Sequence, residues 1–197
     1  MAIPPLEKTL LSLDDLLALG SDAWVEIING EIITMSPVGG LHHIIVSNIA
    51  WLLELYVRRT GVGSVFPDGL IYLMGSDSKG LKNSFVPDVS FIHRDSIPAD
   101  WDIAKPYPGA PDLAVEVMSP DDKAPVIIQK VRTYLDKGTR EVWVIYPESR
   151  ELHQYRAGSD TVRIYRGTET LDAEMLFPGI ENLTTTAIFS LPDWAAR

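Results

Sequence analysis

The feature that most constrains the fold of this chain is a pair of apolar runs that each carry an acid. Residues 85–92 read FVPDVSFI and residues 111–119 read PDLAVEVMS, and their β-branched content predicts two strands of a buried sheet. A carboxylate within a buried strand costs several kcal/mol of desolvation unless it is paired, protonated or bound to a cation. Asp88 and Glu116 therefore need an explanation, and the one we favour is a shared divalent metal ion.

Two Pro-Asp dipeptides compete to supply the second metal ligand beside Glu116. Asp112 lies four residues before Glu116 on the same strand, so at ~3.3 Å per residue the two side chains stand about 13 Å apart. Asp88 lies on a separate strand, and neighbouring strands ~4.8 Å apart would let both carboxylates reach one cation. We therefore predict that Asp88 and Glu116 bind Mg²⁺ (or Mn²⁺), which takes one or two carboxylates and keeps waters or substrate phosphate in its other positions. Asp112 is then a structural acid at a strand start.

Two other interpretations of the acids stay open. Two carboxylates on adjacent strands could serve a glycosidase as general acid and as base or nucleophile. Such a site normally adds a groove of aromatic side chains, whereas Trp101 is expected in a loop and Trp143 in a buried strand. The acids could also be purely structural and accept hydrogen bonds from backbone amides.

Patterns along the rest of the chain predict one α/β domain that spans residues 1–197. Leucines at helical spacing indicate a short helix at residues 9–20. The dipeptide Asn29-Gly30 predicts a hairpin of two short strands within residues 24–35. In the two-residue hairpin turn that Asn-Gly favours, both positions need positive φ angles, which Asn and Gly adopt readily.

The middle of the chain predicts a long helix followed by strands and loops. We expect an irregular start and then a strand at residues 65–74, a polar loop at 75–80, the first central strand at 84–93 and a loop at 94–109 that could form a rim of the site. Before these, residues 41–59 form the longest helix, whose expected buried side is made by Ile44, Ile45, Asn48, Ile49, Leu52, Leu53 and Tyr56.

The second central strand, at residues 113–118, precedes a helix at 126–137 and a third buried strand at 141–146. The close spacing predicts a strand-helix-strand unit with parallel strands. The remaining strand-like pieces are expected to form edge strands and a cover for the core, at residues 151–156, 161–166, 174–178 and 188–194.

Composition excludes several classes of protein. The chain has no cysteine, so it can have neither a disulfide framework nor a thiolate zinc site nor a cysteine nucleophile. A basic start and a cleavage motif are missing, and no run approaches the ~20 apolar residues of a membrane span, so we expect a cytoplasmic protein without membrane contact. The formal net charge of −10 is the opposite of a broad basic footprint for duplex DNA, so contact with nucleic acid must depend on local patches.

Four segments together resemble a known family. VEIINGEI, FVPDVSFI, PDLAVEVMSP and QKVRTYLDKGTREVWVIYP look like the Uma2-type endonucleases, also catalogued as a domain of unknown function, within the PD-(D/E)XK nuclease superfamily. The resemblance runs over about residues 13–191. It implies a restriction-endonuclease-like core, a mixed β-sheet flanked by helices, and frequent homodimers.

The resemblance also implies roles for individual residues. Glu26 is similar to an early active-site glutamate of the family, Asp88 to its motif aspartate and Glu116 to the acid of the (D/E)XK half. The lysine that usually follows two residues after the second acid is replaced by Met118. Relatives of this kind supply the lysine from the following helix, where Lys130 stands in this sequence.

Two further residues are candidates for the same pocket. Tyr134 follows Lys130 by one helical turn and could line the pocket with it. His43 lies in the first turn of the long helix, where a histidine is either a hydrogen-bonded surface group or a site residue.

We therefore expect a Mg²⁺-dependent endonuclease that hydrolyses phosphodiester bonds of DNA. In this hypothesis Asp88 and Glu116 bind the metal, Glu26 orients water or a second ion, and Lys130 stabilises the attacked phosphate or the nucleophile. The alternative is a catalytically silent module that keeps the fold for nucleic-acid or protein interaction, which the acidic net charge and Met118 favour.

Overall fold

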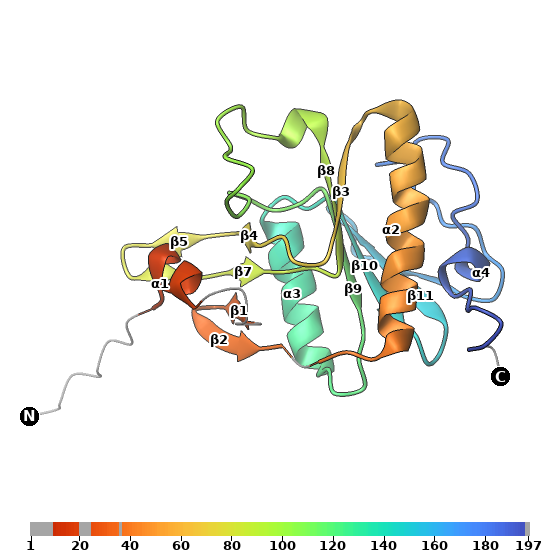
Figure 1. Ribbon diagram of the computed structural model, residues 1–197, viewed down its shortest axis with the longest axis horizontal. Helices are drawn as coiled ribbons and strands as arrows, with labels where there is room; N and C mark the ends of the chain where they lie inside the picture. The colour runs from red at the N-terminus through yellow and green to blue at the C-terminus, as the bar shows by residue number, and fades with distance from the viewer. Residues whose placement is uncertain (1–9, 20–24, 36, 196–197) are drawn as a thin grey trace, which may run out of the picture.

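Three β-sheets, one of them a two-stranded hairpin, and four α-helices make up the described part of the chain (Figure 1). The computed structural model describes residues 10–19, 25–35 and 37–195. Within these, the larger sheet has six strands in the order β12-β11-β10-β9-β8-β3. Its strands are β3 (Gly63–Pro67), β8 (Val89–His93), β9 (Leu113–Val117), β10 (Glu141–Tyr146), β11 (Glu151–Arg156) and β12 (Arg163–Tyr165).

The remaining elements surround this sheet. A four-stranded sheet has the order β2-β1-β7-β4, and β5 pairs with β6 as a separate hairpin. These strands are β1 (Val25–Ile28), β2 (Glu31–Thr34), β4 (Tyr72–Leu73), β5 (Ser76–Asp77), β6 (Gly80–Leu81) and β7 (Ser84–Phe85). The helices are α1 (Leu13–Ala18), α2 (Gly40–Thr60), α3 (Ala124–Asp136) and α4 (Thr185–Ile188), with one 3₁₀ turn at Arg94–Ser96.

The six-stranded sheet is mixed, as predicted. β9 and β10 are parallel and joined by α3, whereas β8 pairs with β9 in the antiparallel sense. The expected strand-helix-strand unit is therefore confirmed. Every residue of β9 is buried because both faces of the sheet are covered by helices.

Alternation along β9 assigns its side chains to two cores. Leu113, Val115 and Val117 pack in a cluster with residues of α2. Ala114, which points the other way, packs in a second cluster with residues of α3, and Glu116 shares that side by the two-residue period of a strand. Helices α2 and α3 thus cover opposite faces of the sheet (Figure 1).

Helix α2 carries a buried stripe at positions three and four residues apart. It ends at Gly61, whose φ of 66° makes it a left-handed C-cap. By length and composition it is the one described helix that could cross a membrane. Its apolar stripe packs into the core beside β9, as in the core helix of a folded domain. The buried residues are His42, Ile45, Val46, Ile49, Leu53, Tyr56 and Val57.

Local signals placed the N-terminal elements correctly. Ser12 caps α1 and exchanges hydrogen bonds with Asp15 in a capping box. Asn29 and Gly30 have φ angles of 50° and 79°, which gives the predicted two-residue turn between β1 and β2.

The first central strand was wrongly predicted as one continuous element. Residues 84–93 divide into β7, which joins the four-stranded sheet, and β8, which joins the six-stranded sheet. Pro87 lies in the gap, where the missing N–H favours a break in strand pairing. Asp88 therefore lies just before a strand rather than in the middle of one.

Other differences concern pairing that depends on distant residues. Residues 65–74 begin with β3 and become irregular before β4, the reverse of the expected order, and residues 75–80 fall within the hairpin of β5 and β6 rather than an open loop. Residues 174–178 and 188–194 form no strand. Instead, Phe177 and Ile188 are buried in the core, and the Asn48 side chain donates hydrogen bonds to the carbonyls of Ile188 and Ser190.

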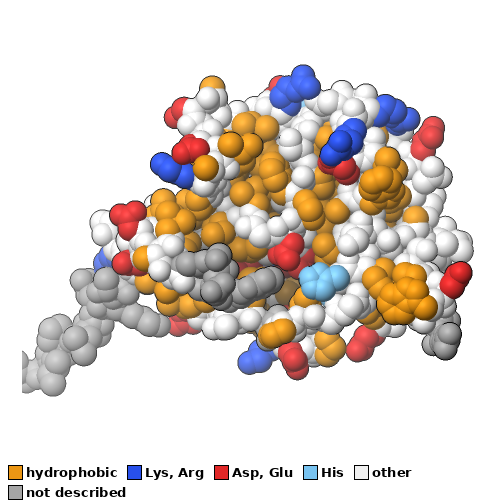
Figure 2. Space-filling view, in the orientation of Figure 1, with side chains coloured by type: hydrophobic (Ala, Val, Ile, Leu, Met, Phe, Trp, Pro, Cys, Tyr) orange, Lys and Arg blue, Asp and Glu red, His pale blue; other side chains and the backbone are white. Residues whose placement is uncertain are grey.

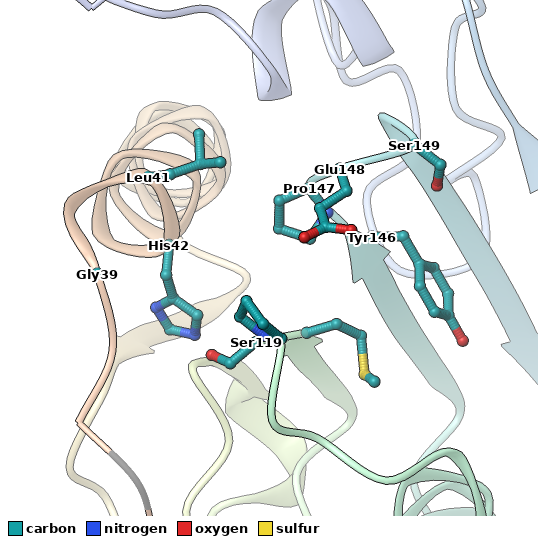
Figure 3. Close-up of a pocket in the computed structure, with 10 residues that line it drawn as sticks. Gly39, Leu41, His42, Ser119, Tyr146, Pro147, Glu148 and Ser149 are labelled. Atoms are coloured by element: carbon teal, nitrogen blue, oxygen red, sulfur yellow. The ribbon is translucent and has the colours of Figure 1, made fainter.

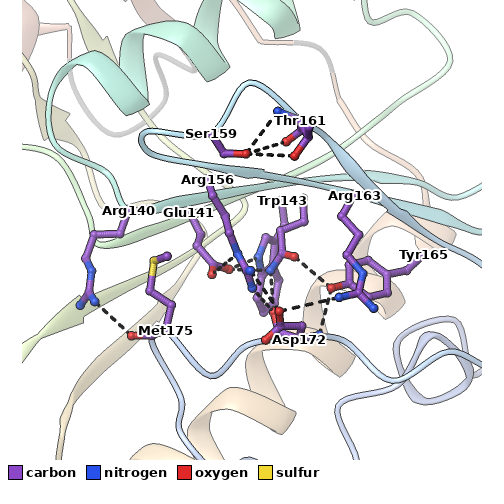
Figure 4. A network of polar contacts seen from close by, with 11 residues as sticks. Arg140, Glu141, Trp143, Arg156, Ser159, Thr161, Arg163, Tyr165, Asp172 and Met175 are labelled. Carbon is purple, nitrogen blue, oxygen red and sulfur yellow. Dashed lines mark hydrogen bonds and ion pairs between the residues drawn. The ribbon is translucent and has the colours of Figure 1, made fainter.

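A buried polar network attaches the C-terminal segment to the sheet (Figure 4). The Glu141 carboxylate is fully buried and accepts hydrogen bonds from Trp143, Gln154 and Arg156 at 2.8–3.0 Å. Arg156 also binds the Asp172 carboxylate at 3.0 Å. Charged side chains of β10 and β11 thereby fix the chain that follows β12.

Candidate active site

Glu116 lies on β9, and Asp88 directly precedes the neighbouring strand β8. Val89 pairs with Val115 in the antiparallel register, so one step outward places Asp88 opposite Glu116. Asp88 Oδ2 accepts a hydrogen bond from the Val117 amide at 2.6 Å, which fixes the carboxylate against β9. The two acids thus come from neighbouring positions at one end of the large sheet.

Lys130 projects from α3 into the same place. Its Nζ lies 2.7 Å from Glu116 Oε2 and 2.9 Å from both carboxylate oxygens of Glu26. Tyr134, one turn later, donates a hydrogen bond from its hydroxyl to Glu116 Oε1 at 2.8 Å. The Phe85 ring lies 5.6 Å from the ammonium and closes the cluster on its apolar side.

Glu26 reaches the cluster from the other sheet. It belongs to β1, it is 4% exposed, and its Oε1 also accepts a hydrogen bond from the Val86 amide at 2.8 Å. Residues from β1, from the segment before β8, from β9 and from α3 thus meet at one point. The structure brings Glu26, Asp88, Glu116, Lys130 and Tyr134 together.

His43 does not join them, and the expectation that it could line the pocket was wrong. The side chain of His43 is exposed and faces a different surface depression beside Asn48 and Ser190. Its neighbour His42 is buried, and its Nε2 lies 3.2 Å from Asp88 Oδ1. The spacing of α2 contained the signal, since residue 42 continues the buried stripe through Val46 and Ile49 and residue 43 does not.

Burial and charge shift the ionisation of the cluster. Burial raises the pKa of Glu116 to about 8, helped by the charges of Glu26 and Asp88 and opposed by Lys130. Burial lowers the pKa of Lys130, but the charges of Glu116 and Glu26 outweigh it and the net pKa is raised, so the ammonium stays charged. Three carboxylates beside one ammonium leave surplus negative charge, which favours a bound proton or a bound cation.

The same reasoning applies to the two side chains that hold the acids. Burial, followed by the charges of Glu116 and Glu26, raises the pKa of Tyr134 well above its usual value, so its hydroxyl remains a donor. Burial lowers the pKa of His42, but the hydrogen bond to Asp88 and the negative charge of Asp88 raise it more, so the net pKa is raised. Both groups therefore keep protons to donate to the acids.

The cluster opens into a cavity of about 350 Å³. Figure 2 shows acidic side chains beside a histidine in a hollow of this face, bordered by hydrophobic side chains. No residue of the segment 94–109 is among those that line it, so this loop was wrongly expected at its rim. The charged residues that line it, within the described part of the chain, are five acids and two lysines: Glu26, Asp88, Glu116, Asp121, Asp122, Lys123 and Lys130.

The donor atoms of the cavity fit a hard cation. No group of three or more His, Asp or Glu side chains within the described residues is arranged as a ready metal cluster. Asp88 and Glu116 nevertheless offer carboxylate oxygens from facing positions, and Mg²⁺ is commonly held by one or two carboxylates with waters in the other positions. The described residues therefore offer two carboxylates, as such a site requires, and do not form an all-protein cage.

Asp112 has the structural place expected for it. Its Oδ2 accepts a hydrogen bond from the His93 amide at 2.8 Å, which ties the start of β9 to the end of β8. The glycosidase interpretation gains no support, because the described residues that line the cavity include no Trp, Tyr or Phe. Asp88 and Glu26 do accept hydrogen bonds from backbone amides, as the structural interpretation of the acids required. In addition, Asp88 contacts His42 and Glu26 contacts Lys130.

The mixed sheet flanked by helices is an architecture that this chain shares with a solved structure. A crystal structure from Anabaena variabilis ATCC 29413, described as "a putative nuclease belonging to DUF820", has this fold: its TM-score is 0.78 at 24% sequence identity, over 91% of this chain and 97% of that one. The profile of Uma2, described as "Putative restriction endonuclease", matches residues 11–187, so the chain belongs to the Uma2 family. No curated protein sequence matches the chain.

Proposed function

We propose that this member of the Uma2 family is a metal-dependent endonuclease that hydrolyses phosphodiester bonds of DNA. The observation that carries the proposal is the position of Lys130, whose buried ammonium lies between the carboxylates of Glu26 and Glu116. A positive charge among facing carboxylates on two sheets is what hydrolysis of a phosphodiester needs from a protein.

The cluster is hard to explain by stability alone. Two ions removed from water lose several kcal/mol of hydration each, and a buried ion pair often stabilises a fold no better than apolar side chains of the same volume. Here Glu26, Glu116 and Lys130 are each about 95% buried, and they come from three different elements. Such an arrangement supports a functional role for the charges.

Asp88 and Glu116 are the residues that would hold Mg²⁺, or Mn²⁺ in its place. When bound there, the metal would supply a Lewis acid and lower the pKa of a coordinated water. Glu26 orients water, and Lys130 places its charge where the attacked phosphate gains negative charge in the transition state. Tyr134 and His42 act as positioning residues, because their donors hold Glu116 and Asp88.

The test is cleavage of supercoiled plasmid DNA by the purified protein with Mg²⁺ or Mn²⁺. We expect nicked and linear products that disappear with EDTA and with the variant Glu26→Gln. Equal cleavage by wild type and Glu26→Gln would assign the activity to a contaminant and overturn the proposal. An RNA of matching sequence in a parallel reaction decides between the two nucleic acids.

The catalytically silent module remains the second candidate. The net charge of −10, and Met118 at the position where the superfamily has its lysine, favour it. A calorimetric titration with Mn²⁺ separates the two, because an enzyme of the proposed kind must bind the ion and a silent scaffold need not.

We also propose a homodimer for the DNA-cutting form. One cavity attacks one phosphodiester bond, and two copies related by a two-fold axis would present a cavity to each strand of a duplex. Sedimentation equilibrium in the presence of a cognate duplex measures this directly. A monomer that linearises DNA in a single binding event would contradict it.

A further inference from the structure

A second cavity, of about 390 Å³, adjoins the acidic one. It lies between the start of α2 and the ends of β9 and β10, and Figure 3 shows Leu41 and His42 on one side and Pro147 and Glu148 on the other. His42 and Ser119 line both cavities. The second cavity, which we call the side pocket, therefore shares His42 with the acidic cavity, and His42 Nε2 lies 3.2 Å from Asp88 Oδ1.

The side pocket differs from the acidic cavity in its chemistry. Its walls are largely apolar and come from Leu41, Met118, Pro120 and Pro147, with the Tyr146 ring on one flank. Its polar groups stand at the edge, where Figure 3 shows the Glu148 carboxylate turned toward the space between Pro147 and His42. Largely apolar walls with a few polar groups suit an apolar ligand body that carries polar groups on its rim.

The charge of the protein limits how nucleic acid can be held. A binding site that relies on phosphate contacts needs many Lys and Arg side chains, but the net charge is −10 and the described lining of the acidic cavity has more acids than lysines. Contacts with the bases would add affinity that phosphate contacts at this cavity do not supply. Bases that leave the stack bind in pockets through apolar or aromatic faces and hydrogen bonds to their edges.

We propose that the side pocket holds one unstacked nucleobase of the substrate strand, beside the phosphate that enters the acidic cavity. This inference rests on the proposed nuclease function and narrows it to nucleic acid that is single-stranded or locally opened. The carboxylate of Glu148 selects a base that carries an amino group. An ionised carboxylate only accepts hydrogen bonds, and an amino group on the edge of a base donates them. Cytosine, adenine and guanine carry such an amino group, whereas thymine can donate only through its single ring N3–H.

The test uses short fluorescent DNA strands built of abasic nucleotides with a single cytosine, a single thymine or no base. Binding is measured by fluorescence anisotropy in EDTA, so cleavage plays no part. We expect the cytosine strand to bind about tenfold tighter than the abasic strand, the gain typical of one stacked base. The thymine strand should bind less tightly than the cytosine strand, and Glu148→Gln should reduce that difference.

Variants of two exposed serines provide the matched control. Ser149→Trp puts a large side chain at the wall of the side pocket and should make the cytosine and abasic strands bind equally. Ser78→Trp, in the turn between β5 and β6, should leave the tenfold difference intact. Equal binding of the cytosine and abasic strands by the wild type, no binding of any strand, or an unchanged difference in Ser149→Trp overturns the inference.

Plasmid cleavage, measured separately, keeps the two proposals apart. A protein that cleaves DNA with Mg²⁺ but ignores the single base has the proposed function without the side-pocket specificity. A protein that prefers the cytosine strand but cleaves nothing has the base site without the proposed function.

Discussion

At the residue scale, Lys130 decides whether the cluster is an active site. Its charge should act on the transition state more than on the bound substrate, so Lys130→Ala should lower turnover by about 100-fold or more with a smaller change in KM. Because the substitution leaves Glu26 and Glu116 buried without their cation, we also expect lower thermal stability. Single-turnover cleavage well below the unfolding temperature measures the effect.

Lys137→Ala is the control for this experiment, since Lys137 caps the end of α3 on the surface. It should cleave DNA at nearly the wild-type rate. Similar losses in the two variants would remove Lys130 from the mechanism.

Metal binding should depend on two acids and not on the third. Asp88→Asn and Glu116→Gln keep the shape of each side chain but remove the charge, and each should abolish Mn²⁺ binding in calorimetry. Asp112→Asn should bind Mn²⁺ nearly as the wild type does, because Asp112 holds the His93 amide instead. If Asp112→Asn loses the metal and Asp88→Asn does not, the wrong Pro-Asp dipeptide has been assigned.

The affinity for Mn²⁺ should rise with pH. Burial raises the pKa of Glu116 to about 8, so below that pH the carboxyl carries a proton that the metal must displace. One displaced proton weakens binding about tenfold for each pH unit below the pKa, and the effect should level off above it. Calorimetric titrations at pH 6, 7, 8 and 9 check this, and an affinity that is constant from pH 6 to 8 would contradict it.

Strand geometry alone could predict part of this cluster. The pairing of Asp88 with Glu116 followed from strand spacing, because the two acids needed only neighbouring strands. Lys130 lies on a helix, whose position over the sheet is not set by strand spacing, and only the family resemblance pointed to it. His42 was missed because the rotation of α2 about its axis decides which of the two adjacent histidines is buried. Extending the buried stripe backward from Val46 by one turn reaches His42 and not His43.

At the element scale, the predictable parts were those with local causes. The turn at Asn29-Gly30, the long helix and the strands β9 and β10 carry their signals within their own residues. The division between β7 and β8 does not, because Phe85 pairs with Tyr72 in one sheet while Val89 pairs with Val115 in the other. Pairing with distant residues also decides the C-terminal segment, where α4 ends at Ile188 and the expected strand does not form. A short apolar run alone does not distinguish a helix from a strand.

The edge strand β3 depends on the absence of one side chain. A Cβ at Gly63 would lie 2.2 Å from the backbone oxygen of Ile92, so Gly63→Ala must push β3 away from β8. We expect a loss of about 2–4 kcal/mol in the free energy of unfolding, measured by urea titration. Gly40→Ala, where the new Cβ meets no atom within 4 Å, is the control and should be neutral or stabilising.

At the scale of the whole molecule, stability and chemistry lie on different faces of the sheet. The network around Glu141 joins β10 and β11 to the C-terminal segment beside Trp143, which packs in the α2 core. Glu116 lies on the α3 side of the same sheet. A defect in the network should therefore cost stability without disturbing the acids.

Glu141→Ala tests this separation. The variant leaves Trp143, Gln154 and Arg156 without their acceptor in a buried place, so the free energy of unfolding should fall by about 3 kcal/mol. Mn²⁺ affinity at 15 °C should stay within a factor of two of the wild type. The exposed Glu181→Ala is the control for stability, and a loss of Mn²⁺ binding in Glu141→Ala would mean that the two faces are coupled.

The reach of Lys130 across two sheets also has a consequence for the order of folding. Its partner Glu26 is 104 residues earlier in the chain and lies on the smaller sheet, so their ion pair closes a long loop. In a partly folded chain whose six-stranded sheet has formed but whose four-stranded sheet has not yet packed against it, Glu26 would be missing from the cluster. Lys130 would then lack one of its two ion-pair partners. In refolding experiments, far-ultraviolet circular dichroism should therefore recover before cleavage does, and simultaneous recovery would argue against this order. Under the proposed function, a newly synthesised chain would not cleave DNA until this long-range ion pair had formed.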